Sequence, residues 1–255
     1  MKISIITAVL NGRATLADTL ESALAQDYPD IELIVIDGAS TDVTLEIIQR
    51  YAGRIAHAVS EADCGIYDAL NKGIRLASGE AVGFLHSDDC YADDRVLSRI
   101  AAALADPGME SCYGDLLYVH KDNPDRVIRH WRAGPYDRGS LVRGWMPPHP
   151  TFYARRTVYE RLGAFDLNYR IAADYDCLLR FLAVGGISCA YIPEVLVRMR
   201  LGGASNRSLR NLLRKSREDY RALRHNQVGG LGTLLAKNVR KLPQFLVRRN
   251  GADFR

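Results

Sequence analysis

The chain has 255 residues, of which 47% are apolar and 25% charged, and its formal net charge is +4. These values are ordinary for a globular protein and suit one large α/β domain, or one domain with an appendage. The sequence excludes a membrane-spanning helix, because it contains no run of about 18 apolar residues. The five cysteines show no close pair, so neither a zinc site nor a disulfide framework is predicted, and a reduced, cytoplasmic compartment fits best.

The charge is unevenly distributed along the chain. Residues 204–255 carry 13 Lys and Arg against 3 Asp and Glu, whereas residues 1–203 carry 21 against 27. The basic character therefore belongs to the C-terminal tail and not to the rest of the chain.

The first 108 residues alternate between apolar runs and amphipathic stripes. Short apolar runs of this kind are typical of buried strands, and apolar residues three or four positions apart are typical of helices. Strands are predicted over 3–9, 31–36, 55–59 and 81–85, and helices around 16–24, 45–51, 66–76 and 96–104. Strand and helix in alternation predict βαβ units and a parallel sheet.

After Gly108 the pattern changes to β-branched and aromatic segments separated by turns. Residues 112–120 and 127–131 predict an antiparallel pair, and the Gly- and Pro-containing stretch 134–150 predicts a loop. The elements expected beyond it are strands over 151–154, 187–192 and 195–200, and helices over 157–162, 174–184, 207–226 and 231–247.

Polar side chains follow several of the predicted strands at their carboxyl ends. Asp37 follows the second strand, Asp63 the third, and His86, Asp88 and Asp89 the fourth. Because ligands of open α/β sheets bind at this edge, the first, second and fourth strands would form a nucleotide crevice there. Adjacent carboxylates suit a Mg²⁺ ion that holds a diphosphate, although a solvated Asp-Asp turn explains the same residues. The sequence has neither GxGxxG after the first strand nor GxxxxGK[ST], which disfavours the dinucleotide fold and the P-loop.

Five blocks, in this order and spacing, resemble family 2 glycosyltransferases with the GT-A fold. They are ISIITAVLNG (3–12), ELIVIDGASTD (32–42), SEADCGIYDALNKGIRLASGEAVGFLHSDD (60–89), PPHPTFYARR (147–156) and IAADYDCLLRF (171–181). The resemblance covers about residues 1–203 and is nearest to the branch of bacterial surface-polysaccharide and colanic-acid-type assembly. It implies a Rossmann-like, mostly parallel sheet flanked by helices, with a nucleotide-binding half (1–108), an acceptor half (109–203) and a basic helical tail (204–255).

The resemblance also implies which residues bind the nucleotide-sugar donor. Asp37 would receive hydrogens of the base or ribose. Lys72 would either contact a phosphate or be an ordinary surface lysine on a helix. The full set of donor-binding residues expected is Thr7, Ala8, Val9, Asn11, Asp37, Asp63, Asn71, Lys72 and His86.

The same resemblance implies a metal site and a catalytic base. Asp88 matches the last Asp of the family's DxD motif, with Asp89 as a second metal ligand, and the cation would be Mn²⁺ or Mg²⁺. The first Asp of that motif is replaced by His86, which would contact the ribose or the metal, or only fill space. His149 is either a further metal or phosphate ligand or a packed loop histidine. Asp174 matches the family's general base, although the Glu that normally precedes it is Ala173.

The predicted reaction is inverting transfer of a sugar from a nucleotide-sugar donor to a hydroxyl of a growing surface polysaccharide or lipid-linked oligosaccharide. One alternative is a nucleotidyltransferase, but VLNGRATL lacks the Gly-rich, Lys- or Arg-bearing signature that it would need. The other is a non-catalytic nucleotide-sugar-binding protein, which the missing first Asp of the metal motif favours and Asp174 disfavours.

The tail predicts a peripheral association with membranes. Its second segment places Leu234, Leu235, Val239, Leu242 and Phe245 among lysines and arginines, a pattern that suits an anionic lipid surface. A solvated helical face and a homodimer contact are the alternatives. Nucleic-acid binding is not expected, because aromatic residues are sparse among the basic ones and the rest of the chain is acidic. The protein is therefore expected in the cytoplasm, at the inner face of the cell membrane.

Overall fold

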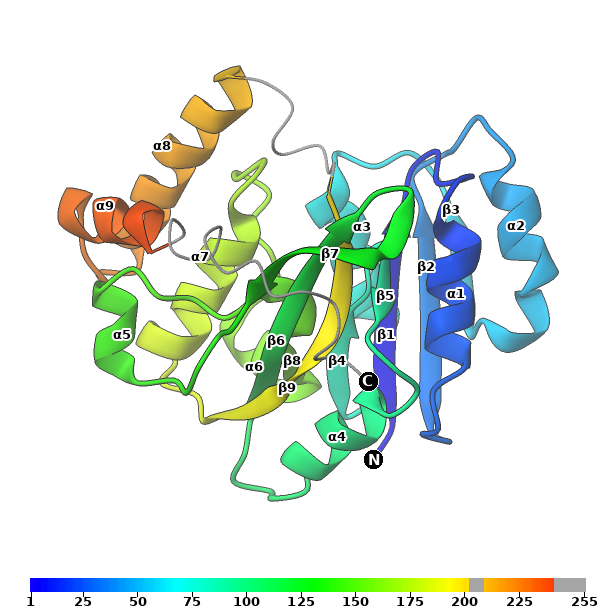
Figure 1. Cartoon of the computed structure of the whole chain (residues 1–255), viewed down its shortest axis with the longest axis horizontal. Coiled ribbons are helices and arrows are strands. Elements are labelled where there is room, and N and C mark those ends of the chain that lie inside the picture. Colours follow the sequence, from blue (N-terminus) through cyan, green and yellow to red (C-terminus); the bar gives the residue numbers. More distant parts are fainter. Residues whose placement is uncertain (202–208, 241–255) are drawn as a thin grey trace.

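The computed structural model describes residues 1–201 and 209–240. Within this part of the chain, nine strands form one sheet in the order β3-β2-β1-β4-β8-β6-β9-β5, with β7 paired to β6 (Figure 1). The strands are β1 (Ile3–Val9), β2 (Ile31–Asp37), β3 (His57–Ser60), β4 (Ala81–Phe84), β5 (Asp89–Tyr91), β6 (Ser111–His120), β7 (Asn123–Trp131), β8 (Tyr153–Arg155) and β9 (Cys189–Arg200).

Helices cover both faces of this sheet and create two apolar cores. One core lies between the sheet and α1, α2 and α4, and the other between the sheet and α3, α6, α7 and α8. The helices are α1 (Leu16–Leu24), α2 (Thr44–Arg50), α3 (Ile66–Leu76), α4 (Val96–Ala103), α5 (Arg138–Val142), α6 (Arg156–Leu162), α7 (Ala173–Leu179), α8 (Leu209–His225) and α9 (Leu231–Val239), with 3₁₀ turns η1 (Ala52–Arg54) and η2 (His149–Thr151) and a π-helical turn η3 (Arg180–Val184).

Strand β1 lies inside the sheet, between β2 and β4, and every one of its residues is buried. Ile3 and Ile5 pack in the core under α1, whereas Ile6 and Ala8 pack in the core under α3, as the alternation of side chains along a strand requires. Helix α3 approaches the sheet closely at Gly73, where a Cβ would lie only 2.3 Å from the side chain of Ile6. The sheet is therefore held from both sides at the strand that carries the site.

The parallel core of the fold is confirmed. Strand β1 pairs in parallel with both β2 and β4, and β2 pairs in parallel with β3. The register sets Val9 beside Asp37 and Ile6 beside Phe84, so the carboxyl ends of β1, β2 and β4 meet at one edge. The antiparallel β6–β7 pair is also confirmed.

Several other expectations need correction. Only four of the eight strand pairings described are parallel, because β8, β7 and β5 join antiparallel. Strand β5 was not predicted, and the two late strands are one bulged strand, β9. The stretch 134–150 is not only a loop, because it contains α5 and the start of η2. The helix predicted over 174–184 is α7 followed by the π-helical η3.

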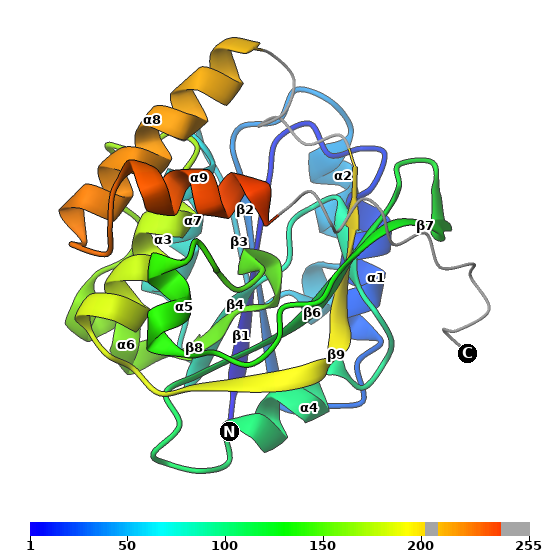
Figure 2. The same cartoon turned by 60° about the vertical axis from the view of Figure 1, so that its left-hand side comes forward.

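The described part of the tail packs on the domain. Helices α8 and α9 lie beside α7 and α5 (Figures 1 and 2), and Ala222 and Leu223 of α8 are fully buried in the same core as α7. The predicted helical segments thus correspond to α8 and α9, while residues 241–247 of the second lie outside the described residues. No helix in the described ranges is both long and apolar enough to cross a bilayer. The predicted division of the chain at 203 stays a prediction.

Candidate active site

Two histidines lie close together at the edge of the sheet where β1, β2 and β4 end, and we call the polar residues at this edge the strand-end cluster. The rings of His86, just after β4, and His149, at the start of η2, lie 5.7 Å apart between centroids. The His149 ring also stacks on Phe84 at 5.5 Å and meets the edge of Phe165 at 5.8 Å. The fold thus brings together two residues that are far apart in the sequence, and both were predicted for the site.

His149 is held as a neutral imidazole. Burial lowers the pKa of His149 to about 4, although the negative charge of Asp174 acts in the opposite direction. Burial also lowers the pKa of His86, against the charges of Asp88 and Asp174. The Nε2 atom of His149 is buried and has no hydrogen-bond partner among the described residues. A buried, unpaired nitrogen is rare and needs an explanation, such as a ligand that completes it.

Asp174 lies in the first turn of α7 and faces the same cluster. Its Oδ1 is 3.1 Å from the hydroxyl of Tyr67, which also lies 2.7 Å from the carbonyl oxygen of Ile171. The single hydroxyl hydrogen is shared between these two acceptors. Burial, and then the charge of Asp174, raise the pKa of Tyr67 well above its ordinary value. Tyr67 therefore remains a neutral donor that orients the carboxylate.

Asp88 and Asp89, though adjacent, have different surroundings. Asp89 is buried, its Oδ1 accepts a hydrogen bond from the backbone nitrogen of Arg200 at 3.2 Å, and its Oδ2 has no partner in the described chain. Burial, followed by the charge of Asp88, raises the pKa of Asp89 well above its usual range. Asp88 is half-buried, and within the described ranges no side chain hydrogen-bonds its carboxylate. Asp88 is thus the better placed of the two to meet a charged ligand.

The donor set at this edge fits a divalent cation that takes most of its ligands from a diphosphate. Among the described residues, no three His, Cys, Asp or Glu side chains gather closely enough to form a metal site by themselves. Mg²⁺, however, commonly uses one or two carboxylates and completes its shell with phosphates and water. The Asp88 carboxylate and His149 Nε2 fit such a role, because neither has a side-chain hydrogen-bond partner among the described residues.

The loops after β1 and β2 are fastened to each other. Asn11 adopts a left-handed backbone (φ 53°), its N–H donates to Ser40 Oγ at 2.7 Å, and its Oδ1 accepts from the Thr41 N–H at 2.9 Å. The fully buried Asp37 accepts from the N–H of Ser40 at 3.0 Å and from Ser60 Oγ at 2.6 Å. Asp37 therefore shapes this rim through its own loop contacts.

Asp63 and Lys72 form an ion pair beside this rim. Lys72 Nζ lies 2.5 Å from Asp63 and 2.8 Å from Glu61. These hydrogen bonds, Asp63 first, raise the pKa of Lys72. A Cβ added to Gly38 would lie 3.0 Å from Asp63 Oδ2, so the Asp63 carboxylate covers the Asp37–Gly38 turn. Lys72 thus positions Asp63 in this structure.

The remaining donor-side residues are buried in structural contacts. Asn71 exchanges two hydrogen bonds of 2.9 Å with the backbone of Phe165 and so joins α3 to the segment before α7. Thr7 is fully buried, with its hydroxyl unpaired among the described residues, and Ala8 and Val9 are 7% and 4% exposed. A ligand can reach these three positions mainly through the backbone at the end of β1.

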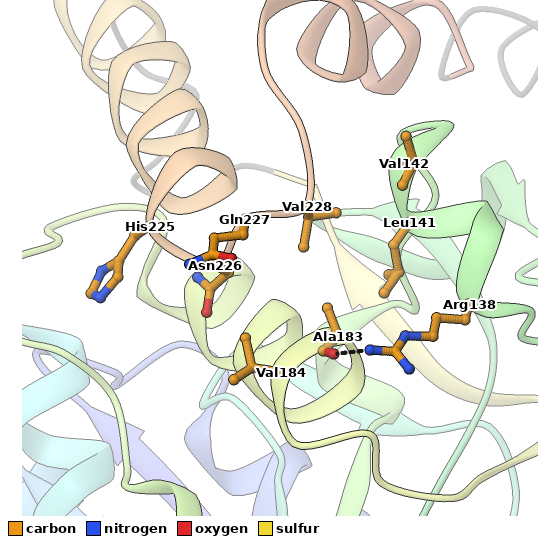
Figure 3. A pocket seen from close by; sticks show the side chains of 9 residues that line it. All are labelled: Arg138, Leu141, Val142, Ala183, Val184, His225, Asn226, Gln227 and Val228. Carbon is orange, nitrogen blue, oxygen red and sulfur yellow. Dashed lines mark hydrogen bonds between the residues drawn. The ribbon is translucent and has the colours of Figure 1, made fainter.

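A separate cavity lies away from the strand ends. It has a volume of about 440 Å³ and is lined by α5, η3 and the turn between α8 and α9. Figure 3 shows Arg138 reaching across one side, where its guanidinium donates to the carbonyl oxygen of Ala183 at 2.9 Å. None of the residues predicted for the site lines it.

Three residues near the site were not predicted. Tyr67 lies within a recognised block, but a tyrosine there gives no separate signal. Arg200 ends the last strand and is 6% exposed; it forms an ion pair with Asp18 at 2.6 Å beside Asp88 and Asp89. Glu218 belongs to the tail, and its contacts with the start of α7 could not be expected from local pattern.

Comparison with known proteins identifies relatives of the chain. The family model for glycosyl transferase family 2 matches residues 4–165. A PGL/p-HBAD biosynthesis glycosyltransferase of Mycobacterium tuberculosis is 31% identical over 208 residues, which cover 80% of this chain and 78% of the relative. An uncharacterized glycosyltransferase of Rickettsia typhi is 28% identical over 235 residues, covering 87% of this chain and 70% of that one.

Solved structures share the fold. S. aureus TarS 1-349 in complex with UDP-GlcNAc superposes with a TM-score of 0.69 at 19% identity, covering 96% of this chain and 72% of that one. The Pyrobaculum calidifontis mannosyltransferase PcManGT, in complex with GDP-Man and Mn²⁺, superposes with a TM-score of 0.66 at 21% identity. The match covers 96% of this chain and 73% of that one. Against a longer TarS chain the TM-score is 0.67 at 20% identity, and this chain spans only 43% of it. These matches confirm a GT-A-type fold, and the family match shows that the chain belongs to glycosyltransferase family 2.

Proposed function

We propose that this glycosyltransferase moves a sugar from a nucleotide-sugar donor to an acceptor hydroxyl with inversion at C1. The observation that carries the proposal is the cluster of Asp174, His149, His86 and Asp88 at one edge of the sheet, next to the fastened loops after β1 and β2. Family membership supports the reaction class. The two related structures with UDP-GlcNAc and GDP-Man make these compounds the first donors to test.

Asp174 is proposed as the general base. In the transfer step, the acceptor O–H gives its proton to the Asp174 carboxylate while the acceptor oxygen bonds to C1. The bond from C1 to the diphosphate oxygen breaks, and the nucleoside diphosphate leaves with the electron pair. Tyr67 supports this role because it can orient the carboxylate without exchanging a proton at neutral pH. The acceptor hydroxyl must come within about 3 Å of Asp174.

The leaving diphosphate would be held at Asp88 with a divalent cation, Mn²⁺ or Mg²⁺. Asp88 and His149 would hold the cation, with Asp89 and His86 beside them, and the cation supplies Lewis-acid compensation of the charge that develops on the diphosphate. The loops joined by Asn11 would cradle the nucleoside, with Asp63 over the Asp37–Gly38 turn. Their mutual hydrogen bonds support a rim that is formed before the donor binds.

The acceptor is proposed to be a growing surface polysaccharide or a lipid-linked oligosaccharide, as in the colanic-acid-type branch. Helix α9 supports a membrane contact, because Leu231, Leu235 and Val239 follow one another at helical spacing and are 60–65% exposed. Helix α8, which packs against α9, carries several arginines. An apolar helical face with nearby cations suits an anionic lipid surface at the inner face of the membrane. A second copy of the chain is the alternative partner of that face.

A panel of nucleotide sugars tests the proposal. Purified protein is incubated with UDP- and GDP-linked sugars and Mn²⁺ or Mg²⁺, and release of the nucleoside diphosphate is measured with and without lipid-linked acceptors. Transfer from one donor, lost in excess EDTA, is the expected result. Formation of a nucleoside triphosphate and a sugar 1-phosphate when pyrophosphate is added would instead support the nucleotidyltransferase alternative. Binding of a nucleotide sugar with no turnover on any acceptor would support a non-catalytic binding protein.

A further inference from the structure

The start of α7 is held by a carboxylate from the tail. Glu218 of α8 directs its Oε2 at three consecutive backbone N–H groups, those of Arg170, Ile171 and Ala172, at 3.1, 2.8 and 3.0 Å. Ala172 is the N-cap residue of α7 and has no side-chain oxygen to cap the helix. Glu218 therefore satisfies backbone donors that a helix N-terminus leaves open, and brings a negative charge to the positive end of the helix.

Tyr67 also forms a hydrogen bond with this segment. Its hydroxyl lies 2.7 Å from the carbonyl oxygen of Ile171 and 3.1 Å from Asp174 Oδ1. Glu218 accepts a hydrogen bond from the N–H of Ile171, and Tyr67 donates one to its C=O. Both backbone polar groups of Ile171 are therefore held by side chains from other helices. Asp174 follows only two residues after Ala172, and its position depends on where this turn is held.

Helices α8 and α9 lie next to α7 (Figure 2), and further contacts fix them there. Asn226, after α8, donates to Asp176 Oδ1 at 2.8 Å. Lys237 of α9 forms a buried ion pair with Asp219 at 2.9 Å, and its ammonium lies 3.2 Å from the centre of the Tyr175 ring. Both side chains of the pair are only 3% exposed. The tail thus contacts the residues on either side of Asp174 in the helix.

We infer that Glu218 is a positioning residue for the base Asp174, and that the tail completes the catalytic edge of the domain. This inference rests on the proposed function. Glu218 does not touch the reacting atoms; it fixes the turn that sets the direction of the Asp174 carboxylate. Misplacing a reacting group by about 1 Å can cost roughly 10²-fold in rate, so loosening this turn is expected to lower turnover without changing how the donor binds.

Three variants of the full chain test it. Glu218→Ala removes the acceptor for the three N–H groups, whereas Glu218→Gln keeps an oxygen at the same reach. Glu160→Ala is the matched control, because Glu160 is an exposed glutamate on α6 that pairs only with Arg156 in the described structure. Hydrogen–deuterium exchange of the peptide over 168–176 reports the turn without any substrate. Binding of UDP with Mn²⁺ and the steady-state parameters for the donor found in the panel report function.

Glu218→Ala is expected to speed hydrogen–deuterium exchange at Ile171 and Ala172 and to lower kcat by about 10–10²-fold. The KM for the donor and the affinity for UDP should stay within about twofold of the parent. Glu218→Gln should recover most of the kcat, and Glu160→Ala should match the parent in every measurement. Unchanged exchange, or unchanged kcat, in Glu218→Ala would overturn the inference. So would a joint fall of kcat, UDP affinity and melting temperature that Glu218→Gln does not recover, because a merely structural residue behaves in this way.

The variant Asp174→Asn separates this inference from the proposed function. If Asp174→Asn loses turnover and Glu218→Ala does not, the base is supported and only the positioning role fails. If Asp174→Asn keeps full turnover, the proposed base fails, and the inference fails with it.

Discussion

The proposed donor side and the proposed base side of the site, which we call the donor side and the base side, are built in different ways. On the donor side, the loops after β1 and β2 are tied together by side chains of the same region, such as Asn11 with Thr41 and Asp37 with Ser40. On the base side, the turn before Asp174 is tied by Glu218, which comes from a helix beyond the last strand. The first arrangement is contained within the βαβ units, and the second depends on the tail.

This difference separates two kinds of pre-organisation. A rim fixed by local hydrogen bonds forms as soon as its strands pair, so changes elsewhere in the chain should leave nucleotide binding intact. A base fixed by a remote helix responds to changes in that helix. Substitutions on the two sides should therefore separate in their kinetics, those on the donor side affecting nucleotide binding and those on the base side affecting turnover.

The largest effect is expected on the base side. Asp174→Asn should lower turnover by roughly 10²–10⁴-fold, the usual contribution of general-base catalysis, while UDP affinity changes little. Steady-state kinetics and calorimetric UDP binding measure the two quantities. The exposed Asp125→Asn serves as the control, since its side chain is 93% exposed. Full turnover in Asp174→Asn would move the base to another group, with Asp176 the next candidate.

A smaller loss, of a different kind, is expected on the donor side. Asp88→Asn should lower transfer by about 10²–10³-fold, the range found when one group that stabilises developing charge is removed. Unlike Asp174→Asn, it should also weaken the binding of UDP in the presence of Mn²⁺. Asp89→Asn should have the milder effect, because Asp89 is buried, and burial raises its pKa and so disfavours its charged form. Unchanged UDP affinity in Asp88→Asn, or full activity of the parent in excess EDTA, would contradict this assignment.

The strands of the donor side were easier to predict from the sequence than the contacts of the base side, for a physical reason. The apolar runs of β1, β2 and β4 are long enough to specify buried parallel strands, and the polar residues at their ends follow directly. Strand β5 is only three residues long and begins with Asp89, so its strand character comes from pairing with β9 and not from local pattern. The role of Glu218 is equally non-local, because its partners lie in a turn that the sequence connects to it only through the fold.

Between the two sides, His149 should affect stability in a pH-dependent way. Its folded pKa of about 4 lies below the ordinary value near 6.5, so the unfolded chain takes up a proton first as the pH falls. Its contribution to stability is therefore complete above about pH 6.5 and is lost progressively between pH 6.5 and 4, by up to roughly 3 kcal/mol.

The check is a comparison of urea unfolding between pH 7 and pH 4.5 in EDTA, for the parent and for His149→Asn and His149→Phe. The difference between parent and variant is the useful quantity, because the raised pKa of Asp89 gives the opposite slope in the parent and remains in both variants. His86 and Asp174, which face His149, also remain. Parallel pH profiles of parent and variants would show that His149 is not held neutral by the fold.

The smallest effect is expected at the membrane contact, and it needs point variants in place of a truncation. Removing residues 229–255 would take away Lys237 and leave Asp219 buried without its ion-pair partner, so it would disturb α7 as well as any lipid contact. The triple variant Leu231→Ser, Leu235→Ser, Val239→Ser changes only exposed side chains. It should reduce partitioning onto anionic vesicles by about tenfold, because part of the apolar burial of three side chains is lost while the cations remain.

Donor hydrolysis by the triple variant should equal that of the parent, since the three side chains are exposed and Lys237, which contacts Tyr175 of α7, is kept. The double variant Val43→Ser, Leu45→Ser is the matched control, because these exposed apolar residues lie at α2, far from α8 and α9 (Figure 1). Flotation with vesicles of increasing anionic content measures partitioning, and sedimentation measures self-association. Equal partitioning of parent and triple variant, with a dimer lost in the variant, would assign this face of α9 to a second copy of the chain.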